Sequence, residues 1–533
     1  MSRSKQAGRR GKSKRAEAEA APERVTKKAK KLDAAKSDEV ASSSDAAREV
    51  VAKLLGETTL DQFMTDYFEK QPLLVRSEGN HKLFDKGLFS RQKLLETVGS
   101  QELEFGKDMT VVRYVDNERE NYLPDNGKLG VKKSQLSGLL NKGYSCQFYQ
   151  PQRYVDGLFQ LNSSFEQVFG CLAGASAYLT PPASQALPPH HDDVEVFIIQ
   201  TEGRKKWKLY RPITELAGEH SSDLSSDLTG DIWMEFTLEE GDMLYFPRGV
   251  IHQACTDEKQ FSTHVTISVY QHNSWANFLE VALPRMVRRA FDSDVSFRRG
   301  LPVQYLSYMG TQFDPESATA KKFVAECKAL VGKLSSWVDP SDLHKAADDA
   351  ALDFIASRLP PATAEDGQTA GFLLESDSKI RFRDRSYVRL VLGEDEEKET
   401  VISVYHSMRN CRLHHMGMCS CILNGEEEDE DDEDDGEEND KDEEDDREEK
   451  DKDDEDDEGS DEHDEEDMGD MPIPPQAQSI VFPESLVSPL MRLYSSYPAA
   501  TPISELVQAG EDETEVRGML LRLWSEGLLE TSD

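Results

Sequence analysis

Two kinds of hydrophobic pattern divide the first half of the chain. Apolar residues recur at helical spacing in Ala47–Leu55 and Leu60–Phe68, which predicts two short amphipathic helices. From Met109 onward the apolar residues form short runs separated by Gly, Pro and Asp, a pattern typical of strands. Several such strands indicate a β-sandwich or jelly roll. The predicted strands are Thr110–Val115, Ser145–Tyr149, Ala177–Thr180, Val194–Gln200, Lys206–Tyr210, Ile232–Leu238, Met243–Phe246 and Thr263–Tyr270.

A helical block follows the strands, beginning after Ser274 and running to about Arg358. In its first helix the apolar residues fall at three- and four-residue intervals, so we expect them to lie on one stripe of the helix. The stripe consists of Trp275, Phe278, Leu279, Ala282, Leu283, Met286 and Val287.

The last part of the chain mixes both patterns. Asp384–Leu392 and Thr400–Tyr405 are predicted strands, and Thr514–Leu528 has one apolar helical face. Together with Leu486–Tyr494 and Pro502–Val507, these elements indicate a winged-helix arrangement. Residues 479–533 hold nine acidic and three basic side chains, which argues against a surface that binds nucleic-acid phosphates. Packing against the helical block or binding a basic partner fits better.

Charge is concentrated in two segments that we expect to be disordered. Residues 426–470 hold 34 acidic and four basic side chains, so they carry about −30 of the net charge of −41. This acidic insertion either attracts basic proteins or is a solvated spacer. The tail Met1 to about Ser44 contains Arg9–Arg15 and Lys27–Lys31, which resemble nuclear or nucleolar targeting signals. The tail would also bind RNA non-specifically, or it only aids solubility.

The remaining composition indicates an intracellular protein. No apolar run approaches the roughly 18 residues of a membrane span, and the N-terminus lacks the apolar core of a signal peptide. Seven irregularly spaced cysteines make a disulfide framework unlikely and fit a reducing compartment.

Candidate metal ligands occur in the sequence His190-His191-Asp192-Asp193. Residues two apart in a strand share a face, so either His190 with Asp192 or His191 with Asp193 points inward. The second register would also turn Glu195 inward without an obvious partner. We therefore expect His190 and Asp192 to be the ligands.

A third ligand and a cation complete the candidate site. His252 follows a strand and turn about 60 residues later, and two imidazoles with one carboxylate form the facial triad of non-haem iron oxygenases. Lys205 lies on the next turn or strand after Asp192, where it could pair with a dicarboxylate cosubstrate. The alternatives are a hydrolytic zinc site, which uses similar ligands, and a histidine that binds no metal.

Four segments carry these residues in a fixed order: Tyr178–Gln185, Pro189–Asp193, Glu202–Trp207 and Gly241–Ala254. They resemble the JmjC-domain ribosomal oxygenases, most closely the nucleolar type with histidyl hydroxylase and lysine-specific demethylase activities. The resemblance implies an α+β fold: a double-stranded β-helix (a cupin-type jelly roll), a helical dimerisation region and a winged-helix domain. The expected division is a basic tail at 1–44, the JmjC domain at 45–273, the helical region at 274–358, the winged-helix domain at 359–424 and 471–533, and the acidic insertion at 425–470.

The resemblance also implies roles for single residues. His190, Asp192 and His252 bind Fe(II), and Lys205 holds the distal carboxylate of 2-oxoglutarate, with O₂ as the other cosubstrate. Tyr178 and Ser268 match positions that line the cosubstrate or substrate pocket. Ser176 stands where the family has Asn, and Gln147 where it has Arg. These two positions lie close to the substrate in relatives, so the departures bear on the target more than on the iron chemistry.

The function implied is hydroxylation of a ribosomal protein side chain, with histidine as the expected target, in the nucleus or nucleolus. No catalytic residue is expected beyond the metal ligands. Two alternatives stay open: a histone lysine demethylase that acts in chromatin regulation, and a non-catalytic binding module in ribosome assembly or chromatin. A homodimer is expected, with no membrane partner.

Overall fold

The computed structural model describes residues 43–77, 84, 87–115, 118–124, 127–225, 227–362, 378–413 and 477–532. Almost all of the predicted basic tail and the whole acidic insertion lie outside the described residues. Within the described part of the chain, no helix is both long enough and apolar enough to cross a bilayer.

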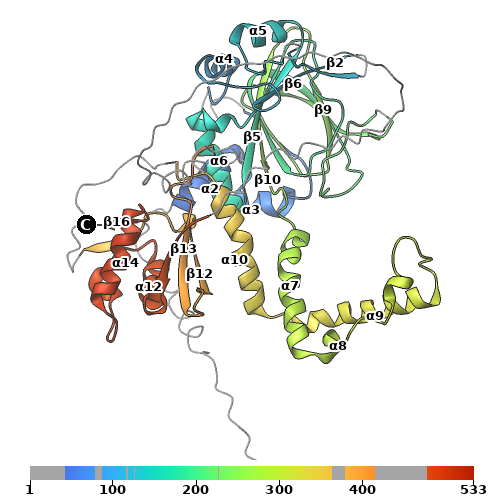
Figure 1. The fold of residues 1–533 in the computed structure, drawn as a ribbon. Coiled ribbons are helices and arrows are strands. Elements are labelled where there is room, and N and C mark those ends of the chain that lie inside the picture. The colour runs from blue at the N-terminus through green and yellow to red at the C-terminus, as the bar shows by residue number, and fades with distance from the viewer. Residues whose placement is uncertain are drawn as a thin grey trace, which may run out of the picture. The chain divides into compact units, whose positions relative to one another are not determined.

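A ten-stranded antiparallel sheet forms the core of the first module (Figure 1). Its main path runs β1-β8-β6-β10-β5-β4-β2-β3, and β7 and β9 pair with β6 outside this path. This arrangement agrees with the predicted jelly roll. The strands are β1 (Leu73–Val75), β2 (Met109–Val115), β3 (Glu118–Asn121), β4 (Ser145–Tyr149), β5 (Ala173–Thr180), β6 (Glu195–Tyr210), β7 (Ile232–Glu239), β8 (Met243–Phe246), β9 (Ile251–Cys255) and β10 (Ser262–Val269).

The prediction of separate strands at Val194–Gln200 and Lys206–Tyr210 is wrong, because β6 continues through both. Its first half pairs with β8 and β10, and its second half pairs with β7 and β9. Gly203 allows this passage, since it has a φ of +61° and a Cβ there would lie 1.9 Å from the carbonyl oxygen of Phe261. One strand thus contributes residues to both layers of the barrel.

Helices pack on the outside of the barrel, with a shared core of buried apolar residues. They are α2 (Ser43–Leu54), α4 (Arg91–Ser100), α5 (Lys133–Asn141) and α6 (Asp156–Phe169). The segment predicted as one helix at Leu60–Phe68 is instead a short α3 (Leu60–Gln62) followed by a π-turn at Phe63–Tyr67. Helix α6 packs against α2, β5 and β10, so it supports two strands whose other faces line the interior.

The helical block contains α7 (Trp275–Ser293), α8 (Val295–Arg298), α9 (Ala318–Leu334) and α10 (Pro340–Ser357). The predicted helix is confirmed as α7, but most of its apolar stripe is not buried in the single chain. Only Ala282 and Met286 of that stripe are buried, whereas Trp275 is 81% exposed. Helix α7 packs mainly against α10, which covers too narrow a surface to bury the whole stripe.

The C-terminal module has its own apolar core and two three-stranded sheets. Strand β14 (Gln478–Pro483) pairs with β13 (Thr400–His406), although residues 414–476 separate them in sequence. The sheets are completed by β11 (Lys379–Phe382), β12 (Val388–Glu394), β15 (Thr501–Pro502) and β16 (Leu529–Ser532), and the helices are α12 (Val487–Ser496), α13 (Ile503–Leu506) and α14 (Glu513–Ser525).

Candidate active site

Backbone hydrogen bonds bring the predicted metal ligands together. His190 and His252 form an isolated antiparallel bridge, in which each backbone N–H donates to the carbonyl of the other residue. The N–H of Gly249 donates to the carbonyl of Asp192 over 2.9 Å. Gly249 suits this tight turn because its φ is +85° and a Cβ would lie 2.6 Å from the carbonyl oxygen of Thr214. The backbone itself therefore fixes the spacing of the three residues.

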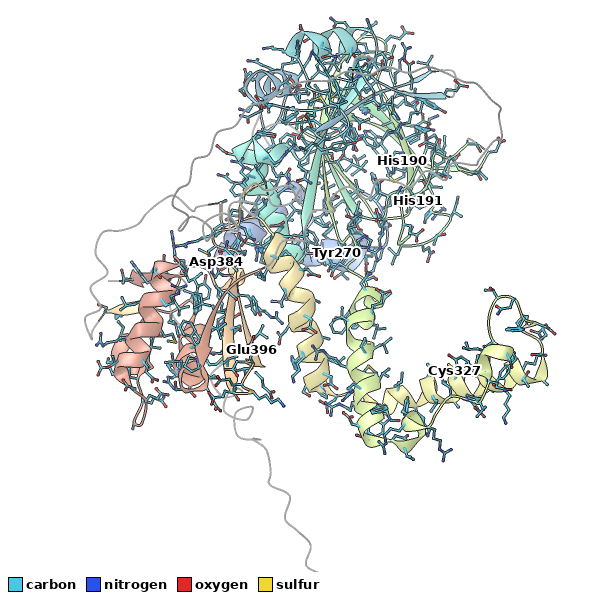
Figure 2. The ribbon with its side chains drawn as sticks, in the orientation of Figure 1. His190, His191, Tyr270, Cys327, Asp384 and Glu396 are labelled. Atoms are coloured by element: carbon cyan, nitrogen blue, oxygen red, sulfur yellow. The ribbon has the colours of Figure 1, made fainter. Side chains whose placement is uncertain are left out.

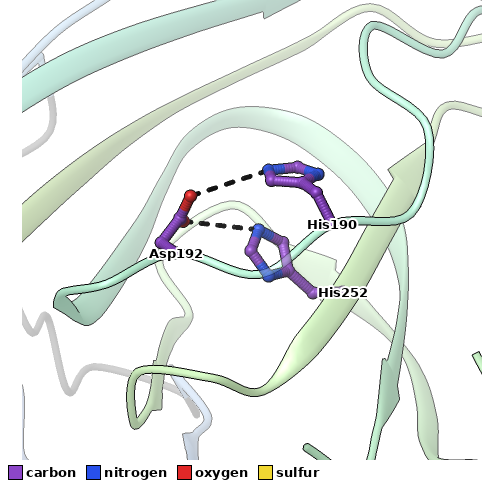
Figure 3. Close-up of side chains that lie close together, drawn as sticks. All are labelled: His190, Asp192 and His252. Carbon is purple, nitrogen blue, oxygen red and sulfur yellow. Dashed lines mark ion pairs between the residues drawn. The ribbon is translucent and has the colours of Figure 1, made fainter. Parts of the chain in front are cut away.

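The three side chains converge on one point (Figure 3). Asp192 Oδ1 lies 3.9 Å from His190 Nε2, and its Oδ2 lies 3.7 Å from His252 Nε2. One ligand atom from each residue falls within 4.8 Å of the others. Two imidazole nitrogens and one carboxylate oxygen are the donor set of a facial-triad iron site. Because all three lie on one side of a cavity, further coordination positions stay open.

Both imidazoles are oriented for metal binding by their other nitrogen. The Nδ1 atoms of His190 and His252 lie 2.9 and 3.1 Å from the carbonyl oxygens of Pro188 and Val250. An Nδ1–H that donates to a carbonyl leaves the lone pair on Nε2, where the metal would bind. Burial, and then the charge of His190, lower the pKa of His252 to about 4, so its imidazole is neutral at physiological pH.

The structure places His190 and Asp192 inward and the neighbouring pair elsewhere. Val196 and Ile198 line the pocket with them, in the preferred register. His191 and Asp193 are not among the residues that line this pocket. Asp193 instead accepts a hydrogen bond from Gln271, and Figure 2 labels His191 next to His190.

One premise of the register prediction was wrong, because Glu195 does have partners. Its side chain is fully buried with the core residues on the opposite face of β6. There it accepts a hydrogen bond from Tyr245 and forms a 2.9 Å ion pair with Arg248. Burial is the main cause that raises the pKa of Glu195. The argument that excluded the second register was therefore wrong, although Val196 and Ile198 line the pocket as expected.

Lys205 is a buried amine without an acidic partner among the described residues. The residue is 3% exposed, and its Nζ donates to Thr180 Oγ1 over 3.0 Å. Burial lowers the pKa of Lys205 to about 7. A buried ammonium group needs a counter-charge, and an anionic ligand in the adjoining pocket would supply it.

One pocket connects the triad with Lys205. It encloses about 470 Å³ of empty space, part of which is open to solvent. Its lining includes, besides the three metal-ligand candidates and Lys205, Tyr178, Ala186, Leu187, Val196, Ile198, Trp207, Gln253, Ala254, His264 and Thr266.

The other predicted pocket residues lie on neighbouring strands and are not part of this lining. Gln147 on β4 is opposite Tyr178, and Ser176 on β5 is opposite Thr266. Ser268 on β10 shares the face of Thr266. Sequence reasoning missed His264 and Trp207, although His264 shares the same two-residue alternation on β10 and could have been found from it.

Comparison with known proteins places the chain in a family. Residues 147–278 match the model of the JmjC domain. The chain is 35% identical to the bifunctional lysine-specific demethylase and histidyl-hydroxylase NO66 of Culex quinquefasciatus, over 70% of this chain and 59% of that protein. It is 33% identical to ribosomal oxygenase 1 of Homo sapiens, over 72% and 61% of the two chains. The match therefore spans about three fifths of these two relatives.

A shorter relative is matched over most of its length. Ribosomal oxygenase 2 of Rattus norvegicus is 35% identical over 68% of this chain and 78% of that protein. The chain belongs to the JmjC-domain ribosomal oxygenase family.

Proposed function

We propose that this protein is a 2-oxoglutarate-dependent oxygenase that hydroxylates a side chain of a ribosomal protein. One observation carries the proposal: a single pocket has the His190, Asp192 and His252 donor set at one part and the buried Lys205 at another, and no acidic side chain of the described residues pairs with Lys205. A 2-oxo acid with a second carboxylate satisfies both parts at once. A hydrolytic zinc site would supply no anion to pair with Lys205.

The residues of the chain have separate tasks in this reaction. His190, Asp192 and His252 would hold Fe(II), which when bound supplies the activation of O₂. Lys205 binds the distal carboxylate and so orients the cosubstrate toward the metal. Val196, Ile198 and Trp207 exclude water from the space between them. In the balanced reaction, 2-oxoglutarate and O₂ give succinate and CO₂, and the second oxygen atom enters a C–H bond of the substrate.

The target class follows from the relatives' names, which include ribosomal oxygenase and histidyl-hydroxylase. We infer a histidine of a ribosomal protein as the substrate and the nucleus, including the nucleolus, as the location. Demethylation of histone lysine is the second candidate, because one relative's name also carries that activity. Hydroxylation leaves a stable alcohol, whereas oxidation of an N-methyl group releases formaldehyde, so the two products separate the candidates.

A matched set of variants tests the proposal. Full-length protein is incubated with Fe(II), 2-oxoglutarate, O₂ and ribosomal proteins, and succinate and a one-oxygen mass increment are measured. His190→Ala and Asp192→Ala should lower succinate formation more than about 100-fold, since even loss of a residue that only orients a ligand costs 10–100-fold. The controls His191→Ala and Asp193→Ala alter adjacent side chains of the same types and should retain activity. Absence of succinate with the unaltered protein would overturn the proposal.

We also infer that the protein is a homodimer formed through its helical block. Several large apolar side chains of this block are exposed: Val303 is 90% exposed, Leu306 68% and Trp275 81%. Apolar surface of this extent favours a protein partner over water. A second copy of the chain supplies the same apolar surface, and such self-complementary contact is usual in two-fold dimers.

A further inference from the structure

His264 is a buried, polar residue of the pocket that the proposed reaction has not yet used. The residue is 2% exposed and lines the pocket with Lys205. Its Nδ1 is buried and has no hydrogen-bond partner in the part of the chain that the structure describes. Burying a polar atom without a partner costs free energy, so such atoms are uncommon in folded proteins. In a binding pocket, an unpartnered imidazole indicates a ligand that supplies the missing contact.

Neighbouring rings hold the imidazole of His264 in place. It stacks on Tyr178, with centroids 4.8 Å apart and an interplanar angle of 4°. The indole of Trp207 meets it edge-on at 5.4 Å. The stack is set by the backbone, because Tyr178 and His264 are opposite residues of β5 and β10. The ring is therefore oriented before any ligand arrives.

The charge state of His264 fits an anionic ligand that is shared with Lys205. Burial, and then the charge of Lys205, lower the pKa of His264 well below its ordinary value. A neutral imidazole has one N–H donor and one acceptor. A carboxylate offers about four acceptor sites, and Lys205 can fill only some of them. The N–H of a neutral His264 can thus be a second donor to the same carboxylate, and Lys205 remains the positively charged group of the pair.

We propose that His264 is a positioning residue for the cosubstrate, whose N–H donates to the carboxylate that Lys205 binds. This inference rests on the proposed function, because it assumes a dicarboxylate 2-oxo acid. We therefore expect His264 to strengthen the binding of 2-oxo acids that have a distal carboxylate over those that lack it. The metal site, in contrast, binds the 2-oxo acid end of the molecule, which His264 should not affect.

Two probe ligands separate these effects: 2-oxoglutarate and 2-oxopentanoate, which has the same carbon chain without the distal carboxylate. Calorimetry with the full-length protein and Mn(II) measures both dissociation constants. His264→Leu should raise the Kd for 2-oxoglutarate about 10- to 100-fold, the usual effect of losing a hydrogen bond to a charged group. It should leave the Kd for 2-oxopentanoate unchanged. His264→Gln, which keeps a donor, should restore part of the affinity.

The matched control is His406→Leu, which replaces another buried histidine, on β13 of the C-terminal module. It should change neither dissociation constant. Equal weakening of both ligands by His264→Leu indicates a purely structural role and overturns the inference, as does an unchanged preference for 2-oxoglutarate. If the unaltered protein itself does not prefer 2-oxoglutarate, the proposed function fails instead.

Discussion

The low pKa of Lys205 makes cosubstrate affinity depend on pH. In the ligand-free protein, burial lowers the pKa of this amine to about 7, so it loses its proton above neutral pH. A bound carboxylate stabilises the ammonium form and moves the pKa back toward about 10.4. Binding above pH 7 must therefore take up one proton. Affinity is greatest below pH 7, and it falls as the pH rises through the pKa of the free site.

The size of this effect follows from proton linkage. Each pH unit between the free and bound pKa values weakens binding about tenfold, or about 1.4 kcal/mol. At pH 9, two units above the free value, binding should be about 100-fold weaker than on the acidic side, a loss of about 2.7 kcal/mol.

The assay compares 2-oxoglutarate with 2-oxopentanoate by calorimetry from pH 6 to pH 9. The ratio of their dissociation constants isolates the distal carboxylate, because titration of the metal ligands affects both compounds alike. In Lys205→Met, which has no ionisable group at this position, the ratio should no longer change with pH. The reasoning is refuted if the ratio for the unaltered protein is independent of pH, or if Lys205→Met retains the same slope.

Three other predictions concern stability and assembly. Lys205→Met should stabilise the ligand-free protein at pH 7 by a few kcal/mol in urea unfolding. The folded state depresses the pKa of the lysine, so burying its charged form costs stability at every pH below the pKa of the unfolded chain. Equal or lower stability of the variant contradicts this. Arg248→Ala should destabilise by about 3–5 kcal/mol, because it leaves Glu195 buried with one fewer partner; a change under about 1 kcal/mol would show that Tyr245 suffices. Val303→Asp with Leu306→Asp should shift sedimentation from dimer to monomer, and a monomeric unaltered protein would refute the dimer.

The metal-ligand candidates were proposed from a local pattern. Counting in steps of two back from the predicted strand separated His190 and Asp192 from their neighbours, although in the structure β6 begins only at Glu195 and His190 forms an isolated bridge. The distant His252 needed the additional assumption that the Leu244–Gly249 strand and turn return the chain to the same place. In the structure, the backbone bridge between His190 and His252 is the contact that brings His252 back beside His190.

Other features depend on tertiary contacts that no local pattern contains. The predicted break between Gln200 and Lys206 does not occur, because Gly203 has no Cβ and lets β6 pass close to the backbone carbonyl of Phe261. The apolar stripe of α7 was evident, but helical spacing does not say how much of it another element covers. Glu195 looked unsuitable for burial because its partner Arg248 lies 53 residues away in sequence. Buried polar residues of this kind are where sequence reasoning fails first.

Once a divalent metal is bound and Lys205 is protonated, a dianionic cosubstrate balances the charges of the pocket and a monoanion does not. Asp192 contributes −1, a divalent metal +2, protonated Lys205 +1, and the two carboxylates of 2-oxoglutarate −2, which sum to zero. A protonated His264 would add an uncompensated charge, and its pKa is lowered well below the ordinary value. Without the cosubstrate, the buried Lys205 can relieve its own cost by losing a proton near pH 7. While Lys205 is protonated and the imidazole of His264 is neutral, a dianion and not a monoanion therefore completes the site.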